Sequence, residues 1–286
     1  MRIYCFASTG FEGYLVQVEV DIRRGIPGLE IVGLPDSAVR ESRDRVRIAI
    51  RNSGFAFPRD RILVNLAPAD VRKEGSSFDL PIAIAILLQS QEILPGSVGQ
   101  ALVMGELQLS GRIRPVHGVL SAVAAGLEAG ITRFLVPPEN LAEGRALRTG
   151  NVSGPSDLAT AADQISTDRP PTPETTGNVL AGPSIGSGMD FADVRGHAEL
   201  KRALAIAAAG RHHTLLFGPP GSGKTLAAAC IPSILPDLTW EESISVTRVH
   251  SLAGLLGPDC GLIQRPPVRT PHHSASAEGL VGGGRI

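Results

Sequence analysis

Residues 218–225 read Gly-Pro-Pro-Gly-Ser-Gly-Lys-Thr, and this stretch decides how the second half of the chain is expected to fold. An apolar run at 214–217 precedes it, and a second one at 226–229 follows it. A short apolar run that ends at a glycine indicates a buried strand, whereas the run of Leu and Ala after the loop favours a helix. The pattern G-x-x-x-x-G-K-[ST] requires this order of strand, tight loop and helix. We therefore predict an α/β domain around this loop.

The spacing within 218–225 predicts a polyphosphate site, because glycines let the backbone approach an anion and point its N–H groups at it. Lys224 is expected to reach the β- and γ-phosphates, and Thr225 to offer its hydroxyl to Mg²⁺. A glycine-rich turn that binds nothing is the alternative, which the matching flanks disfavour. The predicted ATP-binding residues are Gly218, Pro219, Pro220, Gly221, Ser222, Gly223, Lys224 and Thr225, with Lys224 catalytic and Thr225 the Mg²⁺ ligand.

The composition restricts the remaining classes of function. A chain of 286 residues predicts about two domains. The net charge of −1 and an aromatic content of 4% give no overall case for a nucleic-acid-binding protein. Three widely spaced cysteines without a C-x-x-C pair indicate buried free thiols rather than a disulfide framework or zinc site. With neither a signal-peptide pattern nor a run of about 18 apolar residues, a cytoplasmic protein without a membrane span is predicted.

The region 1–148 mixes strands and helices without strict βαβ alternation, which predicts an α+β domain. Alternating apolar residues at 13–22, followed by a glycine-rich turn and residues 29–32, indicate a hairpin or meander. Asp36 is a plausible N-cap for a helix that runs to about Ser53. Further strands are expected at 61–66, 101–107 and 133–136, and further helices at 80–88, 119–129 and after residue 139.

Four arginines on the first of these helices form a basic stripe at steps of three and four residues. They are Arg40, Arg43, Arg47 and Arg51. Such a stripe is commonly a solvated face, and Glu41 and Asp44 dilute its charge. A contact with nucleic acid or with another subunit is the alternative interpretation.

Gly, Pro, Ser, Thr and Asp dominate from 149 to 188, which predicts a flexible linker between the domains. The second domain is then expected at 189–286, and its first helix at about 198–209.

Several motifs resemble one known family. Those of the second half are the segment Asp190 to His197, the loop 218–225, the segment Arg265 to Ser276, and Val281 with Gly282, Gly283 and Gly284. They resemble the magnesium-chelatase-like branch of AAA+ ATPases. Those of the first half are 31–35 (Ile-Val-Gly-Leu-Pro), 64–70 (Val-Asn-Leu-Ala-Pro-Ala-Asp) and 78–81 (Phe-Asp-Leu-Pro). They resemble the ComM/YifB family within that branch.

The resemblance implies that the first domain has the fold of the Lon protease domain, which is similar to domain 2 of ribosomal protein S5. It puts Ser77 at the position of the Lon nucleophile, within the segment Lys73 to Ser77. Leu120, however, occupies the position of the partner lysine, and a leucine cannot act as a base. Lys73 and His117 are the nearby substitutes, so we expect a fold retained for assembly or binding more than a peptidase.

For the second domain the resemblance implies an AAA+ motor, which needs a Walker B strand ending in a carboxylate. No such run follows Thr225, so the sequence predicts an amino-terminal piece of a protein about twice as long, truncated before Walker B and inactive alone. The complete protein is expected to form a homo-oligomeric ring, a hexamer by resemblance, and to drive DNA branch migration during uptake and recombination of transforming DNA. The alternatives are a magnesium chelatase ATPase subunit and a Lon-like peptidase.

Overall fold

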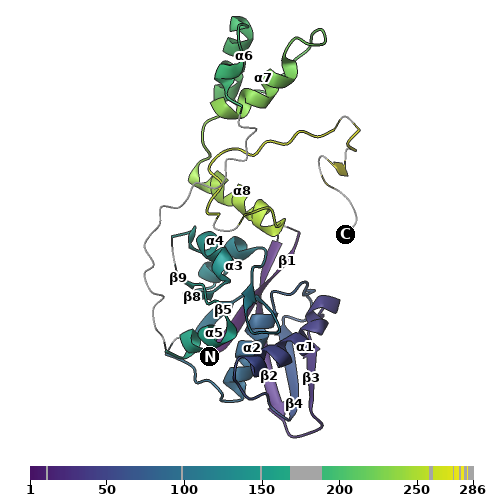
Figure 1. Cartoon of the computed structure of the whole chain (residues 1–286), viewed down its shortest axis with the longest axis vertical. Helices are drawn as coiled ribbons and strands as arrows, with labels where there is room; N and C mark the ends of the chain where they lie inside the picture. The colour runs from purple at the N-terminus through teal and green to yellow at the C-terminus, as the bar shows by residue number, and fades with distance from the viewer. Residues whose placement is uncertain are drawn as a thin grey trace. The chain divides into compact units, whose positions relative to one another are not determined.

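The computed structural model describes residues 1–10, 12–97, 99–148, 150–167, 189–257, 260–272, 274–276, 278–279 and 282 (Figure 1). The chain divides into two units. The first comprises Met1–Gly182 and Ile244–Leu262, and the second comprises Pro183–Ser243 and Ile263–Ile286. Among the helices in the described ranges, none has the length and apolar character needed to cross a membrane.

A mixed sheet of seven strands forms the centre of the first unit, in the order β3-β4-β2-β1-β5-β8-β9. The antiparallel pairs are β1 with β2 and β2 with β4, whereas all other neighbours in this sheet are parallel. A separate ribbon pairs β6 with β7. The strands are β1 (Arg2–Thr9), β2 (Glu12–Arg23), β3 (Gly28–Val32), β4 (Arg61–Ala67), β5 (Gln100–Val103), β6 (Glu106–Leu107), β7 (Ile113–Arg114), β8 (Arg133–Leu135) and β9 (Asn151–Ser153).

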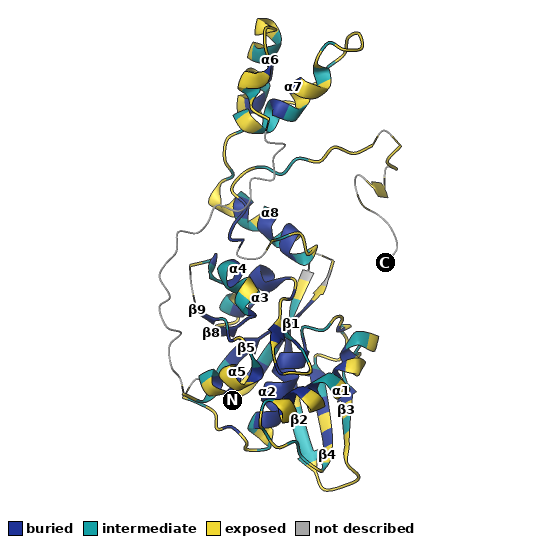
Figure 2. Ribbon diagram, viewed as in Figure 1, coloured by how far each residue is buried: buried dark blue, intermediate teal, exposed yellow. Residues whose placement is uncertain are grey.

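The helix α2 (Asp79–Gln89) is the best-buried helix of this unit, because each residue from Asp79 to Leu87 is buried (Figure 2). A helix that is apolar on all sides must be enclosed on all sides, and α2 contacts α1, α5 and the sheet. The other helices of the first unit are α1 (Ser37–Asn52), α3 (Val119–Glu128), the 3₁₀ turn η1 (Pro138–Asn140), α4 (Leu141–Arg145) and α5 (Leu158–Thr167).

The helix α1 agrees closely with its sequence prediction. Asp36 is its N-cap, and the side chain accepts a hydrogen bond of 2.7 Å from the Val39 N–H. The residues that face the core include Val39, Val46 and Ile50, whereas the four arginines of the stripe are exposed. The amphipathic pattern therefore fixes which side of α1 packs against α2 and β3.

Gly33 lies where the chain leaves β3 and passes close to β4. Its φ is +102°, and a Cβ atom built there would lie 2.2 Å from the carbonyl oxygen of Leu66. Any side chain would therefore force the two strands apart, which explains why a glycine follows β3.

The second unit contains the 3₁₀ turn η2 (Phe191–Asp193), α6 (Ala198–Gly210), α7 (Lys224–Cys230), the 3₁₀ turn η3 (Ile231–Ile234) and the start of α8 (Trp240–Leu252). The predicted helix at 198–209 is confirmed by α6. From Ile244 onward α8 belongs to the first unit, although the sequence placed the whole of 189–286 in one domain.

The structure differs from the sequence predictions in four places within the first unit. The single strand predicted at 101–107 is instead two short strands that belong to different sheets, β5 and β6. The predicted hairpin or meander of 13–22 and 29–32 is wrong, because β4 lies between β2 and β3 in the sheet. The strand β1 was not foreseen. The predicted linker 149–188 contains β9 and α5, and Leu158 and Ile165 of α5 are fully buried, so this part of the stretch contributes to the core. Residues 168–188 of the predicted linker lie outside the described residues.

The predicted strand at 214–217 is also wrong. These residues have no regular secondary structure, and Leu215 and Phe217 are 87% and 90% exposed. A strand needs neighbours that pair with its backbone, and no strand occurs among the described residues of the second unit. An apolar run alone was therefore insufficient to predict a buried strand here.

Candidate functional site

The loop 218–225 ends where α7 begins, at Lys224. Three of its glycines have positive φ values, of +152° at Gly218, +78° at Gly221 and +76° at Gly223. A Cβ atom at Gly221 or Gly223 would meet nothing within 4 Å, so backbone conformation, rather than lack of space, favours glycine there. The loop therefore has the local backbone that only glycines adopt without strain.

The ammonium group of Lys224 folds back over this loop. Its Nζ donates hydrogen bonds of 3.0 Å to the Gly218 carbonyl and 2.8 Å to the Pro219 carbonyl, and a longer one of 3.3 Å to Ser222 Oγ. Thr225, the next residue, is exposed. The structure therefore brings the positive charge of Lys224 to the loop, as a phosphate site requires.

These residues fit the polyphosphate part of a nucleotide, since the loop combines left-handed glycines with a positioned ammonium group. Hydrolysis needs in addition a carboxylate that helps to hold Mg²⁺. Within the described ranges no group of three or more His, Cys, Asp or Glu side chains is arranged to hold a metal ion. What the described residues offer is thus a loop whose backbone and lysine fit a phosphate group.

The segment Lys73 to Ser77, which the resemblance related to a nucleophile loop, lies beside the start of α1. Lys73 is fully buried, and its Nζ donates a hydrogen bond to the Pro68 carbonyl. Burial lowers the pKa of Lys73 below its ordinary value. Its backbone N–H donates to the Leu34 carbonyl at 3.1 Å. Lys73 therefore connects its own segment to the segment that contains Leu34, after β3, and to the one that contains Pro68, after β4.

Ser77 lies between β1 and the start of β6. Its carbonyl accepts hydrogen bonds from the Gly105 N–H at 3.1 Å and from Cys5 Sγ at 3.7 Å. Burial raises the pKa of Cys5 to about 12, so this thiol remains protonated and is no nucleophile. All three cysteines are free and buried, which confirms the prediction of buried free thiols.

Leu120, at the position of the Lon lysine, is fully buried in a small apolar cluster with Ala146 and Leu262. Its N–H donates a 2.7 Å hydrogen bond to Glu143 Oε1. A base at residue 120 would therefore lie inside this apolar cluster. His117, which was considered together with Lys73 as a substitute base, is exposed. Leucine has no basic group, so residue 120 does not supply the base that a serine nucleophile needs.

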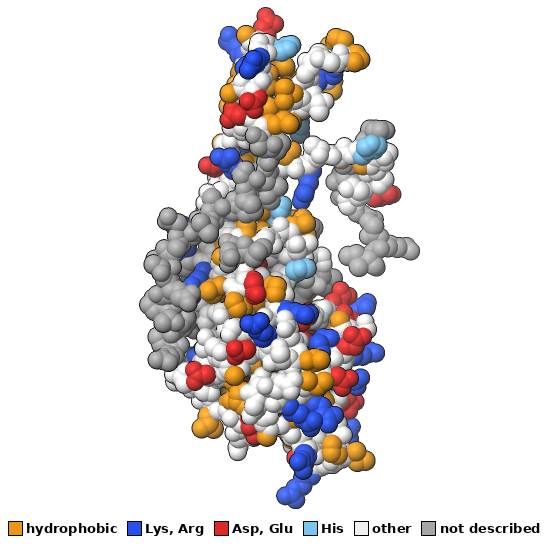
Figure 3. Space-filling view, in the orientation of Figure 1, with side chains coloured by type: hydrophobic (Ala, Val, Ile, Leu, Met, Phe, Trp, Pro, Cys, Tyr) orange, Lys and Arg blue, Asp and Glu red, His pale blue; other side chains and the backbone are white. Residues whose placement is uncertain are grey.

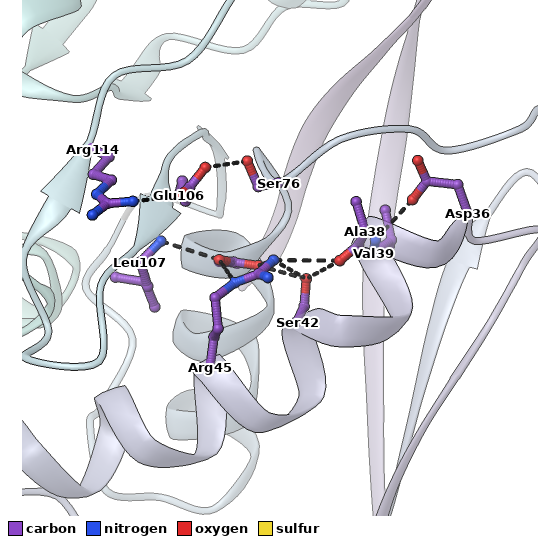
Figure 4. Close-up of polar contacts among 10 residues, drawn as sticks. Asp36, Ala38, Val39, Ser42, Arg45, Ser76, Glu106, Leu107 and Arg114 are labelled. Carbon is purple, nitrogen blue, oxygen red and sulfur yellow. Dashed lines mark hydrogen bonds and ion pairs between the residues drawn. The ribbon is translucent and has the colours of Figure 1, made fainter.

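A buried ionic network, which sequence reasoning did not identify, fixes α1 to α2 (Figure 4). Asp79 is fully buried; it accepts a hydrogen bond of 2.5 Å from Ser42 Oγ and forms an ion pair of 2.9 Å with Arg45. The Leu107 N–H donates to the same carboxylate at 3.2 Å. Burial raises the pKa of Asp79, while these donors act in the opposite direction.

Glu143 forms a second buried polar centre that the sequence did not reveal. Besides Leu120, its carboxylate accepts hydrogen bonds from Ser251 Oγ at 2.5 Å and from Asn140 Nδ2 at 3.0 Å. Burial raises the pKa of Glu143 above its ordinary value, and these hydrogen bonds counteract that effect. Glu143 thereby joins α3 and α4 to the last turn of α8.

Comparison with known proteins relates both halves of the chain to one family. Residues 18–140 match the family described as subunit ChlI of Mg-chelatase, and residues 190–286 match the family described as magnesium chelatase, subunit ChlI. Competence protein ComM of Haemophilus influenzae is 40% identical over 287 residues, and protein YifB of Escherichia coli is 38% identical over 295 residues. Each alignment covers 99% of this chain. This is a ComM/YifB-like protein.

The ComM/YifB-like chain spans about half the length of the relatives it matches, 56% for ComM and 55% for YifB. The Lon protease of Salinispora arenicola is 29% identical over 143 residues, which is 47% of this chain and 18% of that protease. Together with the mixed sheet, this partial similarity fits the predicted α+β, Lon-like first domain. The matches as a whole support an AAA+ ATPase family.

Some family motifs extend beyond the described residues. His273, Val281, Gly283 and Gly284 lie outside them, as does the end of the chain at Ile286.

Proposed function

We propose that this chain supplies the ATP-binding part of an AAA+ motor subunit. The observation that carries the proposal is the loop 218–225, with its left-handed glycines and the Lys224 ammonium group held at 2.8 Å from the Pro219 carbonyl. The similarity to ComM and YifB over 99% of the chain supports the same class.

In the proposed site, the residues Gly218 to Gly223 bind the phosphates through backbone N–H groups. Lys224 would exchange its carbonyl partners for the terminal phosphates and neutralise them, and the Thr225 hydroxyl would help to hold Mg²⁺. Bound Mg²⁺ would supply charge neutralisation at the phosphate oxygens. The role of these chain residues is to orient the nucleotide and balance its charge.

For the complete protein we propose a cytoplasmic homo-oligomeric ring, of six subunits, that uses ATP hydrolysis to move DNA branches during recombination of incoming DNA. The name of the Haemophilus relative, a competence protein, supports this substrate. In this proposal the Lon-like first domain serves assembly or binding, and the domain from about residue 189 binds ATP.

The test uses the complete protein and its Lys224→Ala variant. ATP hydrolysis should fall by about 10²-fold or more, because an ammonium group at the transferred phosphate is lost. The unfolding midpoint of the first domain should be unchanged, and Lys201→Ala, a lysine of α6 in the same unit, serves as the matched control. Wild-type turnover by Lys224→Ala would contradict the proposal.

A magnesium chelatase ATPase subunit is the second candidate, because both matching family models carry that description. The two functions differ in what stimulates ATP hydrolysis. Stimulation by branched DNA favours the motor proposed here, whereas stimulation only by a porphyrin and its chelatase partners favours the second candidate. A peptidase is disfavoured by buried Leu120, so a fluorophosphonate probe should not label Ser77.

A further inference from the structure

A groove of about 560 Å³ lies on the first unit, between α1, the start of β3 and the segment before β4. Four arginines line it, three from α1 and one from the segment before β4. They are Arg43, Arg47, Arg51 and Arg59. Asp44 is the acidic side chain among the lining residues. Figure 3 shows Lys and Arg side chains gathered at the lower end of this unit, over β3 and β4.

The arginines of α1 in this groove are regularly spaced. Arg43, Arg47 and Arg51 follow one another at four-residue steps, so their Cα atoms rise by about 6 Å per step along one side of the helix. This rise is close to the separation of successive phosphates along a nucleic-acid strand. A strand laid along the groove can therefore meet one guanidinium per phosphate.

An aromatic ring holds two of these guanidinium groups in place. The Cζ atoms of Arg47 and Arg51 lie 5.9 Å and 6.0 Å from the centroid of the Phe57 ring. At such distances the ring face attracts the cations and restricts their rotamers. Less side-chain entropy is then lost when the two guanidinium groups bind an anion.

The groove arginines also retain their charge for a partner. In the described part of the chain, none of the ion pairs includes Arg43, Arg47, Arg51 or Arg59. Other exposed arginines of this unit do have carboxylate partners, such as Arg61 with Glu30 at 3.2 Å and Arg72 with Glu74 at 3.2 Å. Arg43 Nε donates to the Arg40 carbonyl at 2.9 Å, a neutral acceptor that leaves its charge in place. Fork-shaped donors that take part in no ion pair suit phosphate oxygens.

We propose that this groove binds the phosphate backbone of a nucleic-acid strand, so that the first unit holds the DNA on which the motor acts. The proposal rests on the DNA-directed function proposed above. It assigns that contact to Arg43, Arg47, Arg51 and Arg59, with Phe57 as the residue that positions two of them. Guanidinium groups that contact only phosphates bind without reading the base sequence.

The test measures binding of a fluorescein-labelled oligonucleotide by anisotropy, without nucleotide, from about 50 to about 200 mM salt. The proteins are the 286-residue chain, its Arg47→Gln/Arg51→Gln/Arg59→Gln variant, and a control of equal charge change, Arg2→Gln/Arg72→Gln/Arg112→Gln, which alters exposed arginines elsewhere. The groove variant should bind at least about 10-fold more weakly. Its slope of log affinity against log salt should be smaller by about 2 to 3, and the control's slope should change by less.

Phe57→Leu separates positioning from charge, because it keeps every arginine. We expect about 3-fold weaker binding with an unchanged salt slope. Equal slopes for the groove variant and the wild type, equal losses in groove and control variants, or no DNA binding by the wild type would each overturn the proposal. Equally tight, groove-dependent binding of poly-glutamate would overturn it in favour of an acidic protein partner.

The result is independent of ATP chemistry. If the complete protein lacks Lys224-dependent hydrolysis while the groove variant still loses DNA binding, the motor function fails and the groove assignment stands. If hydrolysis is intact while the groove variant binds DNA like the wild type, only the groove assignment fails.

Discussion

In the first unit, the helix α2 buries each residue from Asp79 to Leu87, whereas in the second unit Leu215 and Phe217 are 87% and 90% exposed. Burying an apolar side chain of this size contributes about 1.5–3 kcal/mol. The seven-stranded sheet and its helices provide that burial for α2, and the described residues of the second unit provide no sheet for Leu215 and Phe217. A binding loop can thus keep its local conformation where the apolar residues beside it have no core.

Limited proteolysis should reveal the largest difference between the two units. Chymotrypsin should cleave the isolated chain after Leu215 or Phe217 at least about 10³-fold faster than after Phe78 or Phe134, which are fully buried. Cleavage at the buried sites requires unfolding, which costs about 5 kcal/mol or more. Mass spectrometry of the time course should identify a resistant product that contains residues 1–167. Equal resistance of the second unit without ATP would contradict the comparison.

Removing the buried carboxylate of Asp79 should have the next largest effect. Asp79→Ala leaves Arg45 and Ser42 without their partner between α1 and α2, and it should lower the free energy of unfolding by about 3 kcal/mol. Urea denaturation of the first unit's signal measures this change. The matched control is Glu74→Ala, which breaks the exposed pair with Arg72 and should change stability by less than about 0.5 kcal/mol. Similar losses of unfolding free energy in the two variants would show that burial of the carboxylate does not determine how much each ion pair contributes to stability.

The smallest effect concerns Glu143 and the pH. Its pKa is raised in the folded state, so the folded protein favours the protonated form. Relative to Glu143→Gln, the wild type should be most stable below its ordinary pKa of about 4.5 and lose stability as the pH rises through the raised pKa. The loss is about 1.4 kcal/mol for each unit by which the pKa is raised.

Urea titrations of both proteins from acid to neutral pH provide the measurement. Glu139→Gln, on the exposed 3₁₀ turn η1, should show no such trend. A wild type that gains stability over Glu143→Gln with rising pH would indicate that the three hydrogen bonds outweigh burial.

Local signals accounted for what could be predicted from the sequence. The cap at Asp36 and the spacing of apolar residues placed α1 correctly, because both act within one or two helical turns. The pattern of α5 was also present, since Leu158, Ala161, Ala162 and Ile165 are spaced as one helical face and all are buried. The Gly- and Pro-rich composition around it concealed that pattern.

Long-range pairing accounted for most of the failures. Whether β3 pairs with β2 or with β4 depends on a strand about 30 residues further along, which no turn signal encodes. The same holds for the candidate sites. The loop 218–225 was found because its spacing is local, whereas the networks of Asp79 and Glu143 join helices that are distant in sequence. Groove residues Phe57 and Arg59 were missed for the same reason.

The parallel pairing of β3 with β4 has a consequence for how such sequences vary during evolution. It sets Ile31 beside Val64 and Val32 beside Asn65, and Gly33 against Leu66, so two motifs separated along the chain form one structural element. A mutation in either motif changes the selective pressure on the other. Substitutions at 31–33 and at 64–66 should accordingly occur together among related sequences, and a chain that inherits one motif from a different lineage should carry its partner with it.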